Sequence, residues 1–173
     1  MKTLTLGGGC FWCIEAVYDA VIGVVKAESG YMGGDPERAN YKDVCTGTTG
    51  HAEVVQITYD EDQVDLEELL DIFWVVHDPT TLNQQGADRG TQYRSVIYYA
   101  DDEEQKIVEE SVLKAQKLYD DPIVTELSPL QDYFVAEDYH QSYFKNNPTQ
   151  GYCNAVIPPK LDKLKKHFSG LLK

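Results

Sequence analysis

Residues 3–15, Thr3-Leu4-Thr5-Leu6-Gly7-Gly8-Gly9-Cys10-Phe11-Trp12-Cys13-Ile14-Glu15, decide the fold of this chain, because the sequence pattern changes there across three glycines. The alternation of Thr3 to Leu6 predicts a β-strand. From Ile14 to Ile22 the apolar residues recur at helical spacing and predict an α-helix. Cys10 is therefore expected where a strand passes through glycines into the first turn of a helix.

The N-terminus of a helix favours an anion, and a thiolate is an anion. The first backbone N–H groups of the helix are unpaired, and the positive end of its dipole lies there. A free thiol titrates near a pKa of about 8.5, and such a position can lower that pKa. Phe11 and Trp12 are large aromatic residues at this turn and are suited to forming the wall of an apolar pocket. We therefore expect Cys10 to be reactive and to lie beside an aromatic pocket.

Composition narrows the class of protein. A chain of 173 residues with 42% hydrophobic and 25% charged residues is typical of one globular domain, here residues 1–173. A formal net charge of -14 argues against binding nucleic acid or anionic membranes. The apolar stretch at the N-terminus is too short for the hydrophobic region of a signal peptide. No apolar run reaches the length of a transmembrane helix. We expect a cytoplasmic monomer.

The four cysteines, Cys10, Cys13, Cys45 and Cys153, are too few for a disulfide scaffold. In a reducing compartment a C-x-x-C pair indicates redox chemistry or metal binding before it indicates structure. Cys45 shows no pattern that favours a function. Cys153 is expected in an exposed, flexible loop near the end of the chain, from which its sulfur could reach another cysteine.

Periodicity along the rest of the chain predicts alternating strands and helices. Strands are expected at residues 24–31, 52–59, 94–100 and 123–127, and helices at 65–76, 102–118, 134–144 and 159–171. A loop at residues 146–151 precedes the last helix, so that residues 146–173 form a C-terminal segment carrying Cys153. This order predicts an α+β sandwich with a mixed sheet and helices on one face.

Glu53 lies at the start of an otherwise apolar strand, and the alternation leaves its direction open. If it points inward, burial raises the pKa of its carboxyl and makes it a proton donor near neutral pH. If it points outward, it is an ordinary exposed carboxylate. Asp88 in a long polar loop and the phenols of Tyr41 and Tyr93 are further candidates that do not stand out unaided.

The histidines show no metal-binding spacing, and only His140 is kept as a residue that could support a site. The remaining alternatives are chemical. A thiol–disulfide oxidoreductase would use Cys10 and Cys13, and a cysteine hydrolase would pair Cys10 with His51 or His140. A structural zinc site would need all four cysteines, but the second C-x-x-C that such sites favour is missing.

Several motifs taken together resemble peptide methionine sulfoxide reductase A. They are Gly9-Cys10-Phe11-Trp12, Thr48-Thr49-Gly50-His51-Ala52-Glu53, His77-Asp78-Pro79-Thr80-Thr81, Gly90-Thr91-Gln92-Tyr93-Arg94-Ser95, Glu137-Asp138-Tyr139-His140-Gln141 and Gly151-Tyr152-Cys153. The resemblance runs from about Leu6 to Cys153. It implies a ferredoxin-like two-layer sandwich with an irregular C-terminal segment, and an enzyme that repairs proteins after oxidative damage.

The resemblance also implies roles for individual residues. The reaction is reduction of the S epimer of methionine sulfoxide, free or in proteins, with Cys10 as nucleophile and Glu53 as proton donor. The resemblance places Tyr41, Asp88 and Tyr93 around the sulfoxide oxygen and Phe11 and Trp12 against the methyl group. Cys10 becomes a sulfenic acid, which condenses with a second thiol to a disulfide that thioredoxin reduces. No metal or organic cofactor is required.

The second thiol has two candidates in this chain. Many relatives have glycine in place of Cys13 and use a C-terminal cysteine, whereas others use a cysteine at this position. This chain has both Cys13 and Cys153. We therefore expect a relay, in which a disulfide formed at Cys10 passes to a more exposed pair that thioredoxin can reach.

Overall fold

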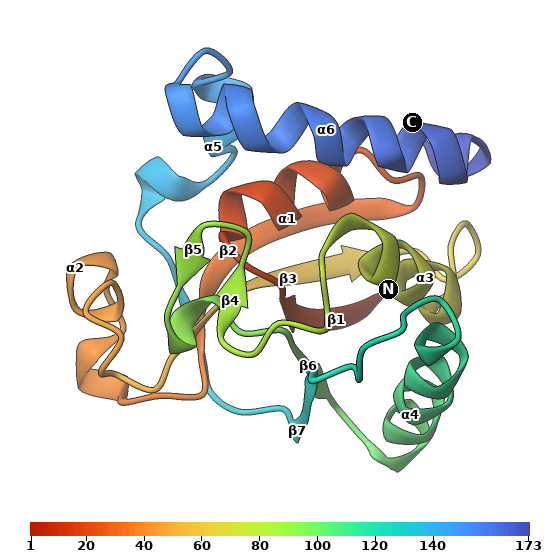
Figure 1. Ribbon diagram of the computed structural model, residues 1–173, viewed down its shortest axis with the longest axis horizontal. Coiled ribbons are helices and arrows are strands. Elements are labelled where there is room, and N and C mark those ends of the chain that lie inside the picture. Colours follow the sequence, from red (N-terminus) through yellow and green to blue (C-terminus); the bar gives the residue numbers. More distant parts are fainter.

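The predicted change from strand to helix at the start of the chain is confirmed. A computed structural model describes residues 1–173 (Figure 1). Strand β1 spans Lys2–Gly7 and helix α1 spans Phe11–Asp19, with the turn Gly8-Gly9-Cys10 between them. The alternation of β1 therefore ends at the glycines, and the helical spacing begins directly after Cys10.

A six-stranded mixed sheet forms one layer of the molecule. Its strand order is β7-β6-β1-β3-β2-β8. The strands are β2 (Val24–Met32), β3 (Ala52–Tyr59), β6 (Val96–Tyr99), β7 (Glu126–Pro129) and β8 (Tyr133–Val135). All neighbouring strands are antiparallel except β6 and β7, which are parallel. The mixed sheet and the α+β class are as predicted.

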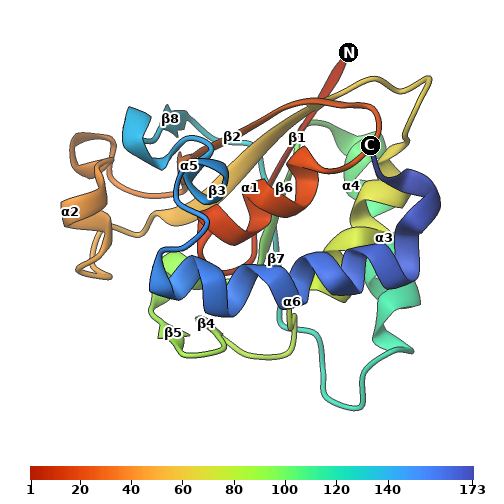
Figure 2. The same cartoon turned by 90° about the horizontal axis from the view of Figure 1, so that it is seen from above.

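Helices cover one face of this sheet. They are α1, α3 (Leu66–Val76) and α4 (Asp102–Gln116), and α6 (Gly151–Phe168) packs on the outside of α1 and α3. Helix α3 begins with a capping box, in which Asp65 and Glu68 each accept a backbone N–H bond from the other residue. Figure 2 shows α6 running along α1 toward α3, and the three helices pack against one another.

The direction of side chains on β3 separates two apolar cores. Val55, Ile57 and Tyr59 belong to the large core between the sheet and the helices, whereas Ala52 and Val54 belong to a small core on the opposite face. Because alternate side chains of a strand share a face, Glu53 lies on the helix face with Val55. The open question about the direction of Glu53 is therefore decided by the strand's register.

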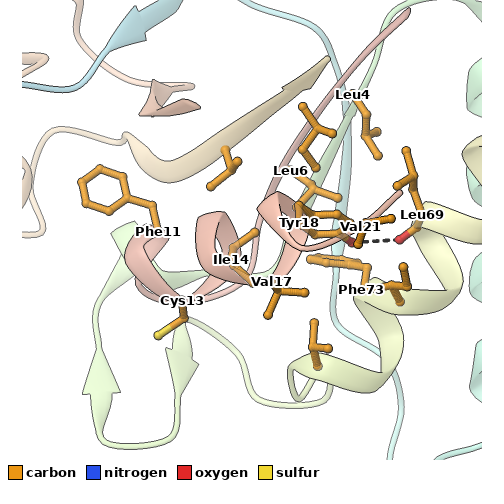
Figure 3. Close-up of a cluster of buried hydrophobic side chains, with 14 of the residues drawn as sticks. Leu4, Leu6, Phe11, Cys13, Ile14, Val17, Tyr18, Val21, Leu69 and Phe73 are labelled. Carbon is orange, nitrogen blue, oxygen red and sulfur yellow. Dashed lines mark hydrogen bonds between the residues drawn. The ribbon is translucent and has the colours of Figure 1, made fainter. Parts of the chain in front are cut away.

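Residues from β1, α1 and α3 meet at the centre of the large core (Figure 3). Leu4 and Leu6 pack from the sheet and Val17 and Phe73 from the helices, and all four are almost completely buried. Each such side chain stabilises the fold by about 1.5–3 kcal/mol. This core fixes the first turn of α1 against the sheet, which holds Cys10 and Cys13 in place.

Short elements form the periphery. They are helices α2 (Tyr41–Val44) and α5 (Tyr143–Asn146), the hairpin of β4 (Gln84–Gln85) and β5 (Asp88–Arg89), and single 3-10 turns at Pro36–Arg38, Thr91–Tyr93, Asp138–His140 and Ser169–Leu171. No helix combines the length and the apolar character needed to span a membrane. The long polar loop at residues 83–91 is thus a small hairpin.

Two predictions for the C-terminal third are wrong. The segment 134–144 is not a helix, because its aromatic residues end strand β8 and then enter a 3-10 turn. The C-terminal segment is not irregular, because α6 begins at Gly151, where the Gln150 side chain accepts a hydrogen bond from Cys153 N–H at 2.9 Å.

The helix predicted at residues 159–171 is confirmed as the second part of α6, and the two prolines explain why its first turns, residues 151–158, were not predicted as helical. Pro158 and Pro159 remove two backbone N–H groups, which would break a buried helix. The carbonyls that lose their partners belong to Asn154 and Ala155, and both residues are exposed to water. The end of the chain then returns to α1, because Lys173 N–H donates to the Ala20 carbonyl at 3.0 Å.

Candidate active site

Cys10 is the N-cap residue of α1 and lies at the start of the first turn, as predicted. The preceding Gly9 has φ +94, a conformation that favours glycine, and a Cβ at that position would lie 2.8 Å from the Cβ of Gln85. The β4–β5 hairpin therefore packs directly on the glycine turn. The Cys10 side chain is 9% exposed.

Glu53 faces this turn from β3. Its Oε1 accepts a hydrogen bond from Phe11 N–H at 3.1 Å, which satisfies one of the free N–H groups at the start of α1. Its Oε2 is buried and has no partner. Burial raises the pKa of Glu53 to about 8, so that the carboxyl is mostly protonated at neutral pH. A protonated, unpaired carboxyl oxygen is a proton donor available to a ligand.

The two thiols of the C-x-x-C pair have opposite electrostatic surroundings. Burial, a hydrogen bond from its own thiol to Cys13 and the charge of Glu53 raise the pKa of Cys10 well above the ordinary range. The hydrogen bond from Cys10 instead lowers the pKa of Cys13, with the positive charge of Lys160 contributing. The expected low pKa of Cys10 is therefore wrong for the unliganded site, because desolvation outweighs the helix N-terminus.

Aromatic rings gather beside Cys10, and three of them come from distant parts of the chain. Trp12 stacks on Tyr143 with ring centroids 3.8 Å apart, and Phe11 lies 6.4 Å from Tyr41. His140 accepts a hydrogen bond from Trp12 Nε1–H at 2.9 Å and is completely buried. Phe11 and Trp12 thus pack among aromatic rings, and His140 fixes the direction of the indole.

The carboxyl of Glu137 holds two of the tyrosines in this region. It accepts hydrogen bonds from Tyr31 O–H and from Tyr41 N–H, both at 2.9 Å. Burial raises the pKa of the Tyr41 and Tyr93 phenols, and the Glu53 charge contributes to both shifts. Both phenols therefore remain protonated and can donate hydrogen bonds near Glu53.

A cavity of about 120 Å³ opens beside the glycine turn. Cys10, Cys13, Asp88, Tyr152 and Lys160 are among the residues that line it. The Tyr152 hydroxyl donates a hydrogen bond to Asp88 and lies 3.8 Å from Cys13 Sγ. Figure 3 shows the Cys13 sulfur turned away from the apolar core. The structure therefore brings Asp88 to the thiols from a loop 75 residues away in sequence.

Cys153 does not lie in an exposed loop, and that prediction is wrong. It is in the first turn of α6 and has no exposed surface, because it packs into the large core with Ile157 of the same helix. Burial raises the pKa of its thiol, and the Cys13 charge contributes. All four cysteines are free thiols, and only Cys45 is exposed. No group of three or more His, Cys, Asp or Glu side chains is arranged to hold a metal ion.

Sequence reasoning missed two residues of this site, Tyr152 and Lys160. Tyr152 could have been found because it directly precedes Cys153 in the Gly151-Tyr152-Cys153 motif. Lys160 gave no signal, because it is one of several lysines in a basic segment and only the packing of α6 on α1 selects it. The other predicted histidine, His51, supports a loop by accepting a hydrogen bond from Gly34 N–H at 3.1 Å.

The fold and the site define a class of protein, the thiol-dependent oxidoreductases, because a pair of neighbouring cysteines faces a protonated carboxyl group. Residues 2–171 match the family model described as peptide methionine sulfoxide reductase. The chain belongs to this family.

Comparisons with individual proteins agree. The chain is 58% identical to peptide methionine sulfoxide reductase MsrA of Psychrobacter sp. (strain PRwf-1) over 170 residues, which covers 97% of each chain. It is similar to the crystal structure of Mxr1 from Saccharomyces cerevisiae in reduced form, with 36% identity, a TM-score of 0.85 and 90% of each chain covered. A structure of Mxr1 in complex with Trx2 aligns with a TM-score of 0.59 at 26% identity, covering 82% of this chain and 84% of that one.

Proposed function

We propose that this protein reduces the S epimer of methionine sulfoxide, free or within proteins, to methionine by thiol chemistry, and so repairs oxidised proteins. The single observation that carries this proposal is the buried Glu53 carboxyl, which bonds Phe11 N–H beside Cys10. A sulfoxide oxygen leaves sulfur only when it is protonated. An acid fixed against the nucleophile supplies that proton.

The first step uses Cys10 and Glu53. The Cys10 sulfur bonds to the sulfoxide sulfur, Glu53 protonates the oxygen, and the Glu53 carboxylate then takes the Cys10 proton. The S–O bond of the substrate breaks, and the bond between the two sulfurs breaks as the oxygen transfers to Cys10. The oxygen ends on Cys10 as a sulfenic acid and methionine leaves. The sulfoxide sulfur gains two electrons and Cys10 loses two. Burial of the site keeps water from competing for the acidic proton.

Aromatic and polar side chains hold the substrate. Phe11 and Trp12 would contact the methyl group, and the indole direction is set by His140. Tyr41, Asp88 and Tyr93 would surround the oxygen. The phenols of Tyr41 and Tyr93 are suited to this role because they stay protonated beside Glu53.

The second step forms a disulfide and releases water. We propose that Cys13 attacks first, because it lies in the same cavity as Cys10 and follows it within the first turn of α1. Cys153 would receive the disulfide afterwards, which requires the first turn of α6 to open, since its sulfur is buried. If Cys13→Ser and Cys153→Ser each keep full thioredoxin-driven turnover, this relay is wrong.

Thioredoxin is the proposed reductant of the final disulfide. A structure of the yeast relative Mxr1 with Trx2 supports a thiol protein as the partner. Because the cycle needs reduced thiols, we place the protein in the cytoplasm, as a monomer whose residues 1–173 form one catalytic domain.

The core is proposed to be ferredoxin-like. Its element order, β1-α1-β2-β3-α3-β6, and its central strand order, β6-β1-β3-β2, support this description.

The test is product formation from the separated sulfoxide epimers with dithiothreitol, for the wild type and Cys10→Ser. We expect turnover of the S epimer alone and none in the variant. Turnover of protein disulfides without turnover of either epimer would replace this proposal by a disulfide oxidoreductase. Product formed without any reductant would indicate a hydrolase.

A further inference from the structure

Helix α6 brings one cation to the cavity that holds both thiols. Of the side chains lining this cavity, Lys160 is the only basic one. The chain as a whole carries a formal net charge of -14, and the other lysines of α6, at positions 163, 165 and 166, are exposed. Lys160 is partly buried, so its charge is less screened than theirs.

The ammonium group of Lys160 is fixed by the end of another helix. Its Nζ donates a hydrogen bond at 2.8 Å to the carbonyl of Val76, the last residue of α3. A carbonyl in the last turn of a helix has no partner within that helix, and the negative end of the helix dipole favours a cation there. Helix α3 therefore holds the charge of Lys160 at a defined place in the cavity wall.

The positive charge of Lys160 acts on the Cys13 sulfur. It lies in the same cavity, and the positive charge of Lys160 contributes to lowering its pKa. Burial lowers the pKa of Lys160, and the negative charge of Cys13 opposes this by favouring the protonated ammonium. The Tyr152 hydroxyl lies between Cys13 and Asp88, and it donates a hydrogen bond to the Asp88 carboxylate.

Several titratable groups face this pair from the elements packed around it. They are Cys10 before α1, Glu53 on β3, His77 after α3, Asp88 on β5, and Tyr152, Cys153 and Lys163 on α6. Burial lowers the pKa of His77 to about 3 and raises that of Glu53 to about 8, so both are neutral at pH 7. Asp88 and Lys163 are then the other charged side chains near the thiols.

We propose that Lys160 is a positioning residue for the disulfide-forming step, in which it holds negative charge on Cys13 while that sulfur attacks the Cys10 sulfenic acid. The inference rests on the proposed function, in which Cys13 is the first resolving thiol. The Cys13 thiolate bonds to the Cys10 sulfur, the S–O bond of the sulfenic acid breaks, and the hydroxide takes the proton of the Glu53 carboxyl and leaves as water. The sulfenic sulfur is reduced and the Cys13 sulfur is oxidised. No further oxidant is required.

The experiment is a single turnover without reductant, which separates the two steps. Reduced full-length protein is mixed with excess methionine sulfoxide, and samples are quenched at short times. Released methionine reports the first step, and loss of free thiols together with trapping of the sulfenic acid by dimedone reports the second. The variants are Lys160→Met and Lys160→Arg, with exposed Lys166→Met as the matched control, each measured from pH 6 to pH 10.

For Lys160→Met we expect an unchanged rate of methionine release and a rate of disulfide formation about tenfold lower at pH 7. The pH midpoint of the second step should rise by about one unit, because a tenfold change in thiolate population corresponds to one unit of pKa. Lys160→Arg should restore both, and Lys166→Met should match the wild type.

Three outcomes would overturn the inference. If Lys160→Met lowers thermal stability but leaves the pH midpoint of the second step unchanged, Lys160 only ties α6 to α3. If Lys160→Met and Lys166→Met shift the midpoint equally, the effect is one of overall charge. If the wild type releases methionine but loses no thiol at Cys13, Lys160 has no resolving thiolate to act on. Absence of methionine release in the wild type would instead defeat the proposed function.

Discussion

The surroundings of Cys10 and Cys13 differ in charge, although the two residues are only three positions apart in the sequence. Both thiols line one cavity, but Cys10 lies next to the Glu53 carboxyl that bonds the adjacent Phe11 N–H. Cys13 instead contacts the hydroxyl of Tyr152, and Lys160 is the basic side chain of the same cavity. Burial raises the pKa of Cys10, and hydrogen bonding with a nearby cation lowers that of Cys13.

This difference shows that a helix N-terminus does not by itself activate a cysteine. Glu53 takes the Phe11 N–H that could have faced a thiolate, and it adds a carboxyl to a site that is already desolvated. The resting site therefore keeps Cys10 and Glu53 protonated and places the more acidic thiol one turn further on. Such an arrangement stores a proton for the sulfoxide oxygen and a second nucleophile for the following step.

Glu53→Gln tests the acidic side and should have the largest effect among the predictions that follow. We expect the rate of methionine formation to fall by about 10²–10⁴-fold, since Gln cannot donate the proton. In the wild type the activity should decline as the pH rises through about 8, where Glu53 ionises. The variant should lack this decline. An activity within threefold of the wild type would show that another group protonates the oxygen.

The same substitution should change stability in the opposite direction. The pKa of Glu53 is raised from 4.5 to about 8, so the folded state holds a proton that the unfolded chain loses above pH 4.5. The stability of the wild type should therefore fall as the pH rises from about 4.5 through 8. We expect the free energy of unfolding of Glu53→Gln, measured by urea titration, to exceed that of the wild type by about 1–3 kcal/mol at pH 8.5 and to equal it at pH 4.

Cys13→Ser and Cys153→Ser compare the two candidate resolving thiols. In a single turnover Cys13→Ser should accumulate the Cys10 sulfenic acid and form a disulfide about 100-fold more slowly, because the Cys153 sulfur is buried in the core and must first be exposed. Cys153→Ser should form its first disulfide at the wild-type rate. Mass spectrometry of dimedone-treated samples distinguishes them, and the reverse pattern would make Cys153 the first resolving thiol.

Tyr152→Phe removes the hydroxyl between Cys13 and Asp88 and should have a moderate effect. We expect disulfide formation to slow by about three- to tenfold, since Cys13 loses a hydrogen-bonding neighbour worth about 1 kcal/mol while the ring packing on Trp12 is kept. Stopped-flow measurement of methionine release serves as the control, and it should not change. A larger loss in methionine release than in disulfide formation would place Tyr152 on the substrate side.

Cys45→Ser should have the smallest effect. Cys45 is the exposed C-cap residue of α2 and lies outside the cavity that Cys10 and Cys13 line. We expect kcat and KM to stay within a factor of two with either dithiothreitol or thioredoxin. A larger fall in thioredoxin-driven turnover alone would mean that the exposed thiol takes part in the relay.

The start of the chain could be predicted because its signals are local. The alternation before Gly7 and the helical spacing after Cys10 each lie within one element, and the capping box at Asp65 is read from four residues. In the C-terminal third only the helix from residue 159 onward was predicted, and the start of α6 at Gly151 was not. Helix α6 contains two prolines, and it is stable because its buried residues pack on α1 and α3.

The sequence by itself determined the family, the position of Cys10 at the start of a helix and the α+β class, because motifs and periodicity are properties of adjacent residues. Only the tertiary structure decided that Glu53 faces Phe11, that Cys153 is buried and that Lys160 reaches the thiols. Strand register and helix packing set these contacts, and both depend on residues far apart in the chain. The pKa of a thiol follows from such contacts, so its reactivity is a property of the folded protein.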